Sequence, residues 1–309
     1  MLPLLALLGL GAAIAAGRRR AVRHFERDVA ARLPLGSDGL VAGAAPLVLD
    51  GPRVASPDAP GVLVLHGFGD TTQTVRALAE RLHAEGYAVR APLLPGHGRS
   101  LRDFSASDAD AWIAPARAEL ALLRAQGRAL AIVGLSMGGA LGAILAAEAP
   151  DVRALVLLAP YVSMPTTVRR VARVHGVAGL LAPYLRGRGE RSIQDPAAAA
   201  RNLAYGVVSP ALLRELLEVV ERTQAALPKL RAPTLVLQSR EDIRIPVDAA
   251  EREFAKIGSA DRTLEWLTGT GHVITVDYGH ERVFARVVDF LARHLPVAQA
   301  RDAALQHPA

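Results

Sequence analysis

The feature that most constrains the fold is a regular alternation of apolar runs and helical patterns, which begins at Gly61. Between the first two apolar runs, Val75, Leu78 and Leu82 are spaced like residues on one face of a helix. Chains that alternate strands and helices in this way fold into largely parallel sheets that are covered on both faces. The sequence therefore predicts an α/β fold, with strands at the runs GVLVLHG, AVRAPLL, ALAIVGL, RALVLLAP, APTLVLQS and RTLEWL.

The alternation is interrupted between residues 161 and 230, where helical patterns, glycines and arginines replace any clear strand. We expect a helical cap at 161–230, inserted into a core made of residues 35–160 and 231–295, and a polar tail at 296–309. The insertion contains ten Lys or Arg against five Asp or Glu, so its outer surface is basic. A solvated helical face and a surface for an anionic partner, such as lipid headgroups, are both open interpretations.

Residues 1–20 join an apolar run, MLPLLALLGLGAAIAAG, to three arginines at positions 18–20. The apolar run of about 16 residues would extend roughly 24 Å as a helix, somewhat less than a bilayer core of about 30 Å. Because the positive charge follows the apolar run, the pattern differs from that of a cleavable signal peptide. By the positive-inside rule it predicts an N-terminal membrane anchor with the main domain on the cytoplasmic side. The alternative is a packed or frayed terminal helix on a soluble cytoplasmic protein.

Composition excludes several classes of function. The chain has 309 residues, of which 51% are hydrophobic, so it is long enough to bury a full core. It contains no cysteine, which excludes disulfides, thiolate metal sites and a cysteine nucleophile. The net charge is +6, but the arginines are scattered and no nucleic-acid motif accompanies them. We therefore expect no nucleic-acid partner.

A serine stands between glycines where the strand ALAIVGL should pass into a helix. Gly134, Ser136 and Gly138 belong to the stretch GLSMG, which matches the pattern G-x-S-x-G. The two glycines leave room for a tight, strained turn that points the Ser136 hydroxyl away from the sheet. The pattern alone also allows Ser136 to be a simple helix cap. Its interpretation as a nucleophile therefore depends on further features of the chain.

One such feature is the loop HGFGD, which runs from His66 to Asp70 directly after the first buried strand. Acyl-transfer enzymes need backbone N–H donors that stabilise an oxyanion, one from an early loop like this and one from the residue after the nucleophile. We expect Phe68 and Met137 to supply these two N–H groups. An ordinary glycine turn is the alternative for the loop, and we expect a structural role for His66.

Two polar loops follow later strands. The stretch SREDIRIP places Asp242 after the strand TLVLQS, with Glu241 as a neighbour that could compete for the same role. The stretch LTGTGHVITVD places His272 after the last predicted strand. The chain order Ser136, Asp242, His272 is the order of nucleophile, acid and base in α/β-hydrolases. Six other histidines fit a catalytic role less well: His83, His97, His175, His280, His294 and His307.

Together, the stretches LHGFGD, LLPGHG, GLSMGG, SREDIRIP and GTGHVITVD resemble the bacterial carboxylesterase and monoacylglycerol lipase group of the α/β-hydrolase superfamily. The resemblance extends over the whole alternating region. It implies an α/β-hydrolase fold with a helical cap, a catalytic triad of Ser136, Asp242 and His272, and an oxyanion hole formed by Phe68 and Met137. The N-terminal apolar segment is not a usual part of that family.

The resemblance implies a serine hydrolase that cleaves carboxylic esters, with monoacylglycerols or medium-chain acyl esters as the expected substrates. No metal or organic cofactor is needed for this chemistry. One alternative is a peptidase or amidase of the serine aminopeptidase type, which would need an acidic group for the substrate amine. Only weak candidates exist for that group: Glu190, Glu215 and Glu218. A non-catalytic, membrane-tethered binding protein of the same fold is the other alternative.

Overall fold

The structure is a computed structural model that describes residues 2–50, 59–187 and 192–297. Its centre is a seven-stranded sheet in the order β1-β3-β2-β4-β5-β8-β9. Only the edge strand β1 runs antiparallel to its neighbour, so the predicted, mostly parallel α/β sheet is confirmed. The strands are β1 (Leu47–Leu49), β2 (Gly61–Leu65), β3 (Ala88–Ala91), β4 (Leu130–Leu135), β5 (Val152–Leu158), β8 (Thr234–Ser239) and β9 (Arg262–Leu267).

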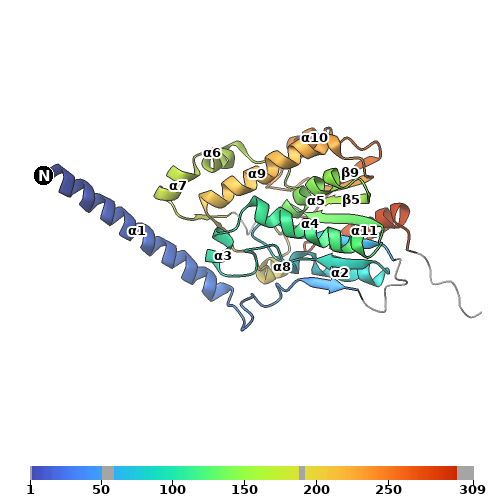
Figure 1. The fold of residues 1–309 in the computed structure, drawn as a ribbon, viewed down its shortest axis with the longest axis horizontal. Coiled ribbons are helices and arrows are strands. Elements are labelled where there is room, and N and C mark those ends of the chain that lie inside the picture. Colours follow the sequence, from blue (N-terminus) through green and yellow to red (C-terminus); the bar gives the residue numbers. More distant parts are fainter. Residues whose placement is uncertain (1, 51–58, 188–191, 298–309) are drawn as a thin grey trace, which may run out of the picture.

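Helices cover both faces of this sheet (Figure 1). One face packs against α4 (Ala109–Ala125) and α5 (Met137–Glu148), and the other against α2 (Gln73–Ala84) and α11 (His280–His294). Successive residues of the strands point to opposite faces, so each buried strand contributes apolar side chains to two separate cores. This explains why the central strands read as continuous apolar runs. Helix α10 (Val247–Phe254) lies between β8 and β9 in the chain.

A short helix that the sequence analysis did not predict, α3 (Leu101–Ser105), follows the PGHG loop. Ser100 caps this helix through a reciprocal pair of hydrogen bonds with Asp103. Two of its apolar side chains, Leu101 and Phe104, are buried. Capping and burial together stabilise a helix that is too short to show a helical pattern in the sequence.

The segment between β5 and β8 is built mainly from helices. These are α6 (Thr166–Arg173), α7 (His175–Leu181), α8 (Pro196–Arg201), α9 (Pro210–Ala226) and the 3-10 helix η2 (Leu227–Lys229). Two short strands, β6 (Leu185–Arg186) and β7 (Val207–Val208), also pair antiparallel within it, although the sequence shows no clear strand there. Helix α9 packs directly on α5, and the Thr223 hydroxyl donates a hydrogen bond to the Ala140 carbonyl over 3.1 Å.

The N-terminal helix α1 (Leu2–Arg32) is longer than the apolar run that begins it, because it continues through the arginines (Figure 1). Its C-terminal end is fixed to the body of the protein, since the Arg32 guanidinium donates to the carbonyls of Ala204, over 2.7 Å, and Tyr205. Further along the helix, Arg18 Nε donates to the Gly179 carbonyl over 3.0 Å. Within the described part of the chain, no helix has the length and apolar character required to cross a membrane.

Candidate active site

Ser136 occupies a strained turn between β4 and α5. Its backbone has φ 54° and ψ −116°, a region that residues with a Cβ rarely adopt. A Cβ atom on Gly134 would lie 2.2 Å from the carbonyl oxygen of Gly138, and one on Gly138 would lie 2.2 Å from that of Leu65. Both positions therefore require glycine, which explains the GLSMG pattern physically.

His272 lies five residues past the last residue of β9 and reaches across the carboxyl edge of the sheet. Its Nε2 is 2.8 Å from Ser136 Oγ, and its Nδ1 is 2.7 Å from Asp242 Oδ2. All three residues are between 6% and 8% exposed. With Nδ1–H donating to the carboxylate, Nε2 is left as an acceptor for the serine hydroxyl proton. The structure thus brings the three predicted residues into one hydrogen-bonded chain.

Asp242 is fixed by four donors. Its Oδ1 accepts the backbone N–H of Arg244, over 2.7 Å, and of Ile245, over 3.0 Å. Its Oδ2 accepts Gln238 Nε2 over 2.7 Å, in addition to His272 Nδ1. Burial alone would raise the pKa of Asp242, but the attraction of His272 and these hydrogen bonds hold it below its ordinary value. The carboxylate therefore stays ionised beside the imidazole.

The neighbouring acid takes a different position. Glu241 is exposed, and its carboxylate accepts a hydrogen bond of 3.1 Å from Ser239 Oγ.

Gln238 was not predicted as a site residue, although the sequence contains a signal for it. It is a fully buried amide in strand β8, directly after the apolar residues Leu235, Val236 and Leu237. A buried amide needs hydrogen-bond partners, and here the catalytic candidate Asp242 is one of them.

The HGFGD loop lies beside the serine. A Cβ atom on Gly67 would be 3.4 Å from Ser136 Cβ. Met137 is the first residue of α5, so its N–H has no acceptor within the helix. The described residues offer no backbone acceptor to the Phe68 N–H either. Neither predicted donor thus has a backbone acceptor among the described residues, and both remain candidates for an oxyanion hole.

Two buried histidines hold this loop. The Leu94 N–H donates to His66 Nε2, and the Gly69 N–H donates to His97 Nε2, each over 3.0 Å. Burial lowers the pKa of His66 to about 4 and that of His97 well below its ordinary value, so both rings are neutral and can accept. The expected structural role of His66 thus has a specific form: it joins the HGFGD loop to the PGHG loop.

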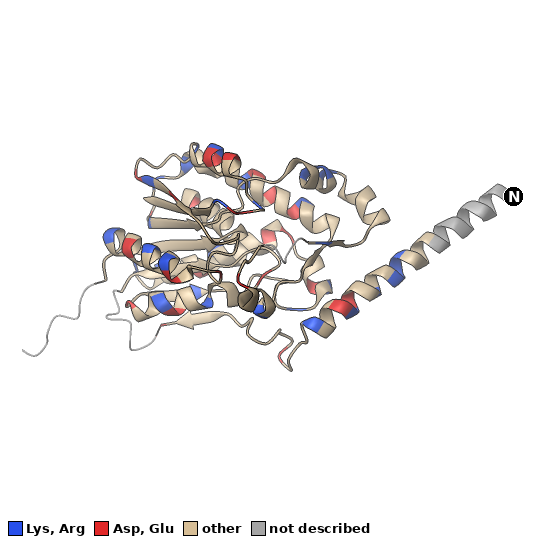
Figure 2. Ribbon diagram, turned by 180° about the vertical axis from the view of Figure 1, so that it is seen from behind, with Lys and Arg blue, Asp and Glu red and all other residues tan. Residues whose placement is uncertain are grey.

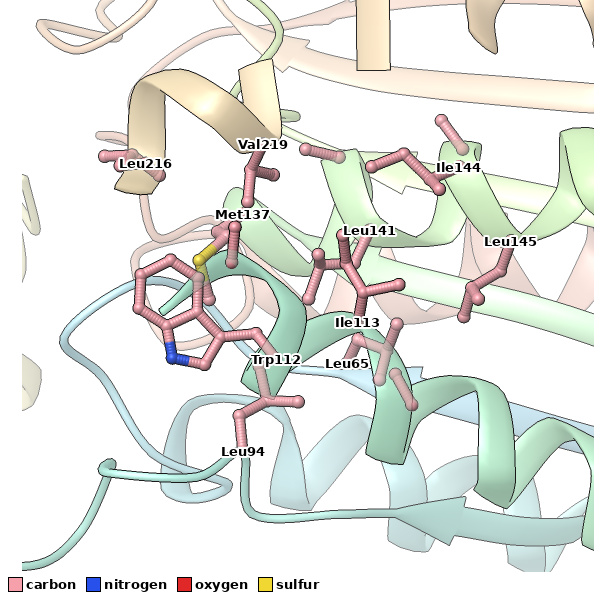
Figure 3. Close-up of a cluster of buried hydrophobic side chains, with 14 of the residues drawn as sticks. Leu65, Leu94, Trp112, Ile113, Met137, Leu141, Ile144, Leu145, Leu216 and Val219 are labelled. Carbon is pink, nitrogen blue, oxygen red and sulfur yellow. The ribbon is translucent and has the colours of Figure 1, made fainter. Parts of the chain in front are cut away.

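Side chains of the predicted oxyanion residues are anchored in the core. The Phe68 ring contacts Phe104 and Trp112, with ring centroids 5.2 Å and 5.6 Å away. Met137 is fully buried, and Figure 3 shows its side chain beside Trp112 of α4 and Val219 of α9. Apolar packing on both residues limits how far their N–H groups can move relative to Ser136.

The remaining candidates lie elsewhere. Glu215 accepts the backbone N–H of Ala109 over 3.3 Å, and Glu218 is paired with Arg214 and Arg222. Glu190 and His307 fall outside the described residues. Four other histidines bind backbone carbonyls or carboxylates: His83, His175, His280 and His294. Across the described residues, no cluster of three His, Asp or Glu side chains could hold a metal ion.

Comparisons with known proteins agree with this geometry. A family model described as serine aminopeptidase, S33, matches residues 57–278. The thermostable monoacylglycerol lipase of Bacillus sp. (strain H-257) is 31% identical over 234 residues, which cover 76% of this chain and 91% of that protein. The carboxylesterase of Bacillus subtilis (strain 168) is 26% identical over 235 residues, covering 75% of this chain and 92% of that protein.

The solved structures show the same relationship. A structure from the metagenome-derived lipolytic enzymes LipS and LipT superposes with a TM-score of 0.73 and 31% sequence identity. It covers 82% of this chain and 100% of that chain. The family model spans more than half of the chain, and the matched relatives are aligned over most of their length. The chain therefore belongs to the serine aminopeptidase S33 family of the α/β-hydrolase superfamily, within its lipase- and esterase-like group of serine hydrolases.

Proposed function

We propose that the protein hydrolyses carboxylic esters through a covalent acyl-enzyme, with Ser136 as nucleophile, His272 as base and Asp242 as the acid that orients the base. The observation that carries the proposal is the continuous hydrogen-bonded chain from Asp242 Oδ2 through His272 to Ser136 Oγ, with bonds of 2.7 Å and 2.8 Å. A helix cap would not need a buried imidazole on its hydroxyl, nor a carboxylate behind that imidazole.

We assign each step of the reaction to a named group. His272 Nε2 takes the hydroxyl proton as Ser136 Oγ attacks the ester carbonyl, and the N–H groups of Phe68 and Met137 stabilise the oxyanion. The protonated imidazole, stabilised by Asp242, then gives its proton to the departing alcohol. Water, activated by the same imidazole, hydrolyses the acyl-enzyme and releases the carboxylic acid.

We propose monoacylglycerols or medium-chain acyl esters as substrates, and residues 161–230 as a cap over the site. The named relatives include a monoacylglycerol lipase and a carboxylesterase. Helix α9 of the proposed cap carries many buried apolar residues, and Figure 3 shows its Val219 near Met137. Peptidase activity is less favoured, because Glu215 and Glu218 already bind other groups of the protein.

The test is a hydrolysis panel of p-nitrophenyl esters of increasing acyl length, monoacylglycerols and aminoacyl amides, with wild type and Ser136→Ala. We expect ester hydrolysis by the wild type, and a loss of several orders of magnitude in kcat in the variant. A folded Ser136→Ala protein that retains the wild-type rate would refute the assignment. Preferential cleavage of the amides would replace the esterase with a peptidase.

We also propose that the protein associates with an anionic lipid surface through α1 and α7. Four large apolar residues at and within α7 are exposed, and Leu181 is 84% exposed. The other three are Val174, Val177 and Leu180. Arginines flank this patch on α6 and α1, while α7 itself carries no charge (Figure 2). Apolar side chains bordered by basic ones match the interface of an anionic bilayer.

Vesicle sedimentation tests this association. Wild type should sediment with vesicles of phosphatidylcholine and phosphatidylglycerol, and less with phosphatidylcholine alone. A variant with Leu180→Ser and Leu181→Ser should lose most of this binding. Leu122→Ser is the matched control, because Leu122 is also an exposed leucine but lies on α4. Equal binding by the double variant and the control would contradict the proposal.

A further inference from the structure

Asp277 is a completely buried carboxylate in the loop that follows His272. Its Oδ2 accepts the backbone N–H of Gly271 over 2.6 Å and of Gln194 over 2.8 Å. Its Oδ1 accepts the N–H of Asp195 and of Tyr278, each over 2.8 Å. Burying a carboxylate is unfavourable unless hydrogen bonds replace its hydration, and four N–H donors supply that replacement.

The four donors come from two parts of the chain. Gly271 and Tyr278 belong to the histidine loop itself, whereas Gln194 and Asp195 belong to the segment inserted between β5 and β8. The carboxylate therefore ties two segments together that are more than 75 residues apart in the chain. A side chain that only stabilised its own loop would not need donors from the insertion.

The same two segments also bind each other through the backbone. The carbonyl oxygen of Ser192 accepts the N–H of His272 over 2.8 Å and that of Val273 over 3.1 Å. A Cβ atom on Gly271 would lie 2.5 Å from this carbonyl oxygen and 3.1 Å from Asp277 Oδ2. The close approach therefore depends on glycine immediately before the histidine.

The loop that carries the catalytic acid reaches the same segment. Arg244 Nε donates to Ser192 Oγ over 3.0 Å, and Arg244 lies two residues after Asp242. Ser192 thus receives hydrogen bonds from the histidine loop on its carbonyl and from the acid loop on its hydroxyl. The start of the 192–195 segment is where the two loops meet.

We propose that Asp277 is a positioning residue, which holds His272 in reach of Ser136 by locking the histidine loop onto the 192–195 segment of the cap. The inference rests on the proposed function, because it assigns Asp277 a role only through the base His272. Among the described residues, Asp277 makes no hydrogen bond to Ser136 or to Asp242. Asp277 acts on the reaction indirectly, because it fixes the position of the backbone around His272.

The primary variant is Asp277→Asn, which keeps the shape of the side chain. It replaces one acceptor oxygen by an NH2 group, which cannot accept a hydrogen bond from the N–H groups that face it. Two of the four hydrogen bonds are then lost, and the backbone next to His272 is released. Small misplacements of a catalytic group can lower rates by about 100-fold, so we expect kcat on p-nitrophenyl butyrate to fall about 10- to 100-fold. KM should change less than about threefold, because the substitution acts on the position of the base and not on the binding of the ester.

Two further measurements separate positioning from general destabilisation. The rate at which a fluorophosphonate labels Ser136 should fall by a similar factor, because labelling also needs the base. The downfield proton NMR resonance of the His272 Nδ1–H bond to Asp242 should broaden or vanish. Asp108→Asn is the control, since Asp108 also accepts a backbone N–H, over 2.7 Å, but at the start of α4. It should retain wild-type kcat, labelling and resonance.

A folded Asp277→Asn protein with wild-type kcat would overturn the inference, as would a lowered kcat with unchanged labelling and resonance. If Asp277→Asn does not fold, Gly271→Ala tests the same lock from its other side, with the same three readouts. If neither variant folds, Asp277 acts in folding and the positioning role is rejected. A wild-type protein that neither hydrolyses esters nor is labelled would refute the proposed function instead.

Discussion

Ser136 Oγ and His272 Nε2 lie 2.8 Å apart, although 136 positions of the chain separate the two residues. The distance is within the range that direct proton transfer requires. It results from the parallel sheet, because the loops that follow β4 and β9 emerge at the same edge. The strained turn raises Ser136 above that edge, and the loop after β9 brings the imidazole over it.

The identity of the catalytic acid can be tested by exchanging each carboxylate for its amide. Asp242→Asn should lower kcat/KM by about four orders of magnitude, because the amide favours the wrong tautomer of the imidazole. Glu241→Gln should stay within about twofold of wild type, since Glu241 binds Ser239 and not His272. Steady-state kinetics on one ester decides between them, and a larger loss in Glu241→Gln would contradict the geometry.

Gln238 should contribute to catalysis through Asp242. Replacing it with Met preserves length but removes the 2.7 Å hydrogen bond to Oδ2. We expect kcat to fall about 10-fold with little change in KM, as for other buried partners of catalytic groups. The control is Gln224→Met, which removes an amide hydrogen bond of 3.0 Å to the Val162 carbonyl. Equal kcat in the two variants would show that the Gln238 amide does not act on the acid.

The turn at Ser136 should tolerate no side chain on its glycines. Gly138→Ala places a Cβ atom 2.2 Å from the backbone oxygen of Leu65, which cannot rotate away. We expect the free energy of unfolding to fall by about 3 kcal/mol or more. Gly176→Ala is the matched control on α7, where a Cβ atom meets nothing within 4 Å. Urea unfolding should show the control unchanged or stabilised by up to about 1 kcal/mol.

Acid should weaken the fold through His66. Its pKa is about 4 in the folded protein and 6.5 in the unfolded chain, so the unfolded state binds a proton that the folded state rejects between these values. Each such proton changes the free energy of unfolding by about 1.4 kcal/mol per pH unit, and stability therefore falls as the pH drops from 6.5 towards 4. His97 acts in the same direction, because burial also lowers its pKa.

Asp70 opposes this trend, since burial raises its pKa to about 7 and its contribution to stability falls as the pH rises towards that value. The effect of His66 is therefore measured as the difference between wild type and a His66 variant in how the free energy of unfolding changes with pH. Urea unfolding of wild type and His66→Asn from pH 4 to 7 should show a shallower loss on acidification in the variant. Parallel curves for the two proteins would mean that His66 does not titrate as its burial requires.

Much of the site could be predicted because strand ends and motif positions determine it. The apolar runs mark β2, β4, β5 and β8, and polar residues directly after β2, β4 and β8 mark loops at the edge that carries Ser136. The pairing of His272 with Asp242, and not with Glu241, depends on the turn after β8, where two backbone N–H groups bind one carboxylate. No periodicity in the sequence reports such a turn.

Other features could not be predicted because they arise only from contacts between distant segments. Asp277 ends the stretch GHVITVD and looks like one more polar loop residue until Gln194 and Asp195 are seen to donate to it. The pairing of β6 with β7 joins strands of two residues each, too short for any pattern. Helix α1 continues beyond its apolar run to Arg32, whose guanidinium donates to carbonyls of the folded body.

The contact of α9 with α5 limits how the enzyme could be re-engineered. Since the Thr223 hydroxyl donates to the Ala140 carbonyl, and Val219 lies near Met137, this helix of the insertion packs on the first turns of α5, next to Ser136. A chimera that takes its cap from a relative should therefore exchange only the part of the cap that precedes α9. Exchanging α9 as well would also remove the contacts that hold the start of α5, and with it the turn that carries Ser136.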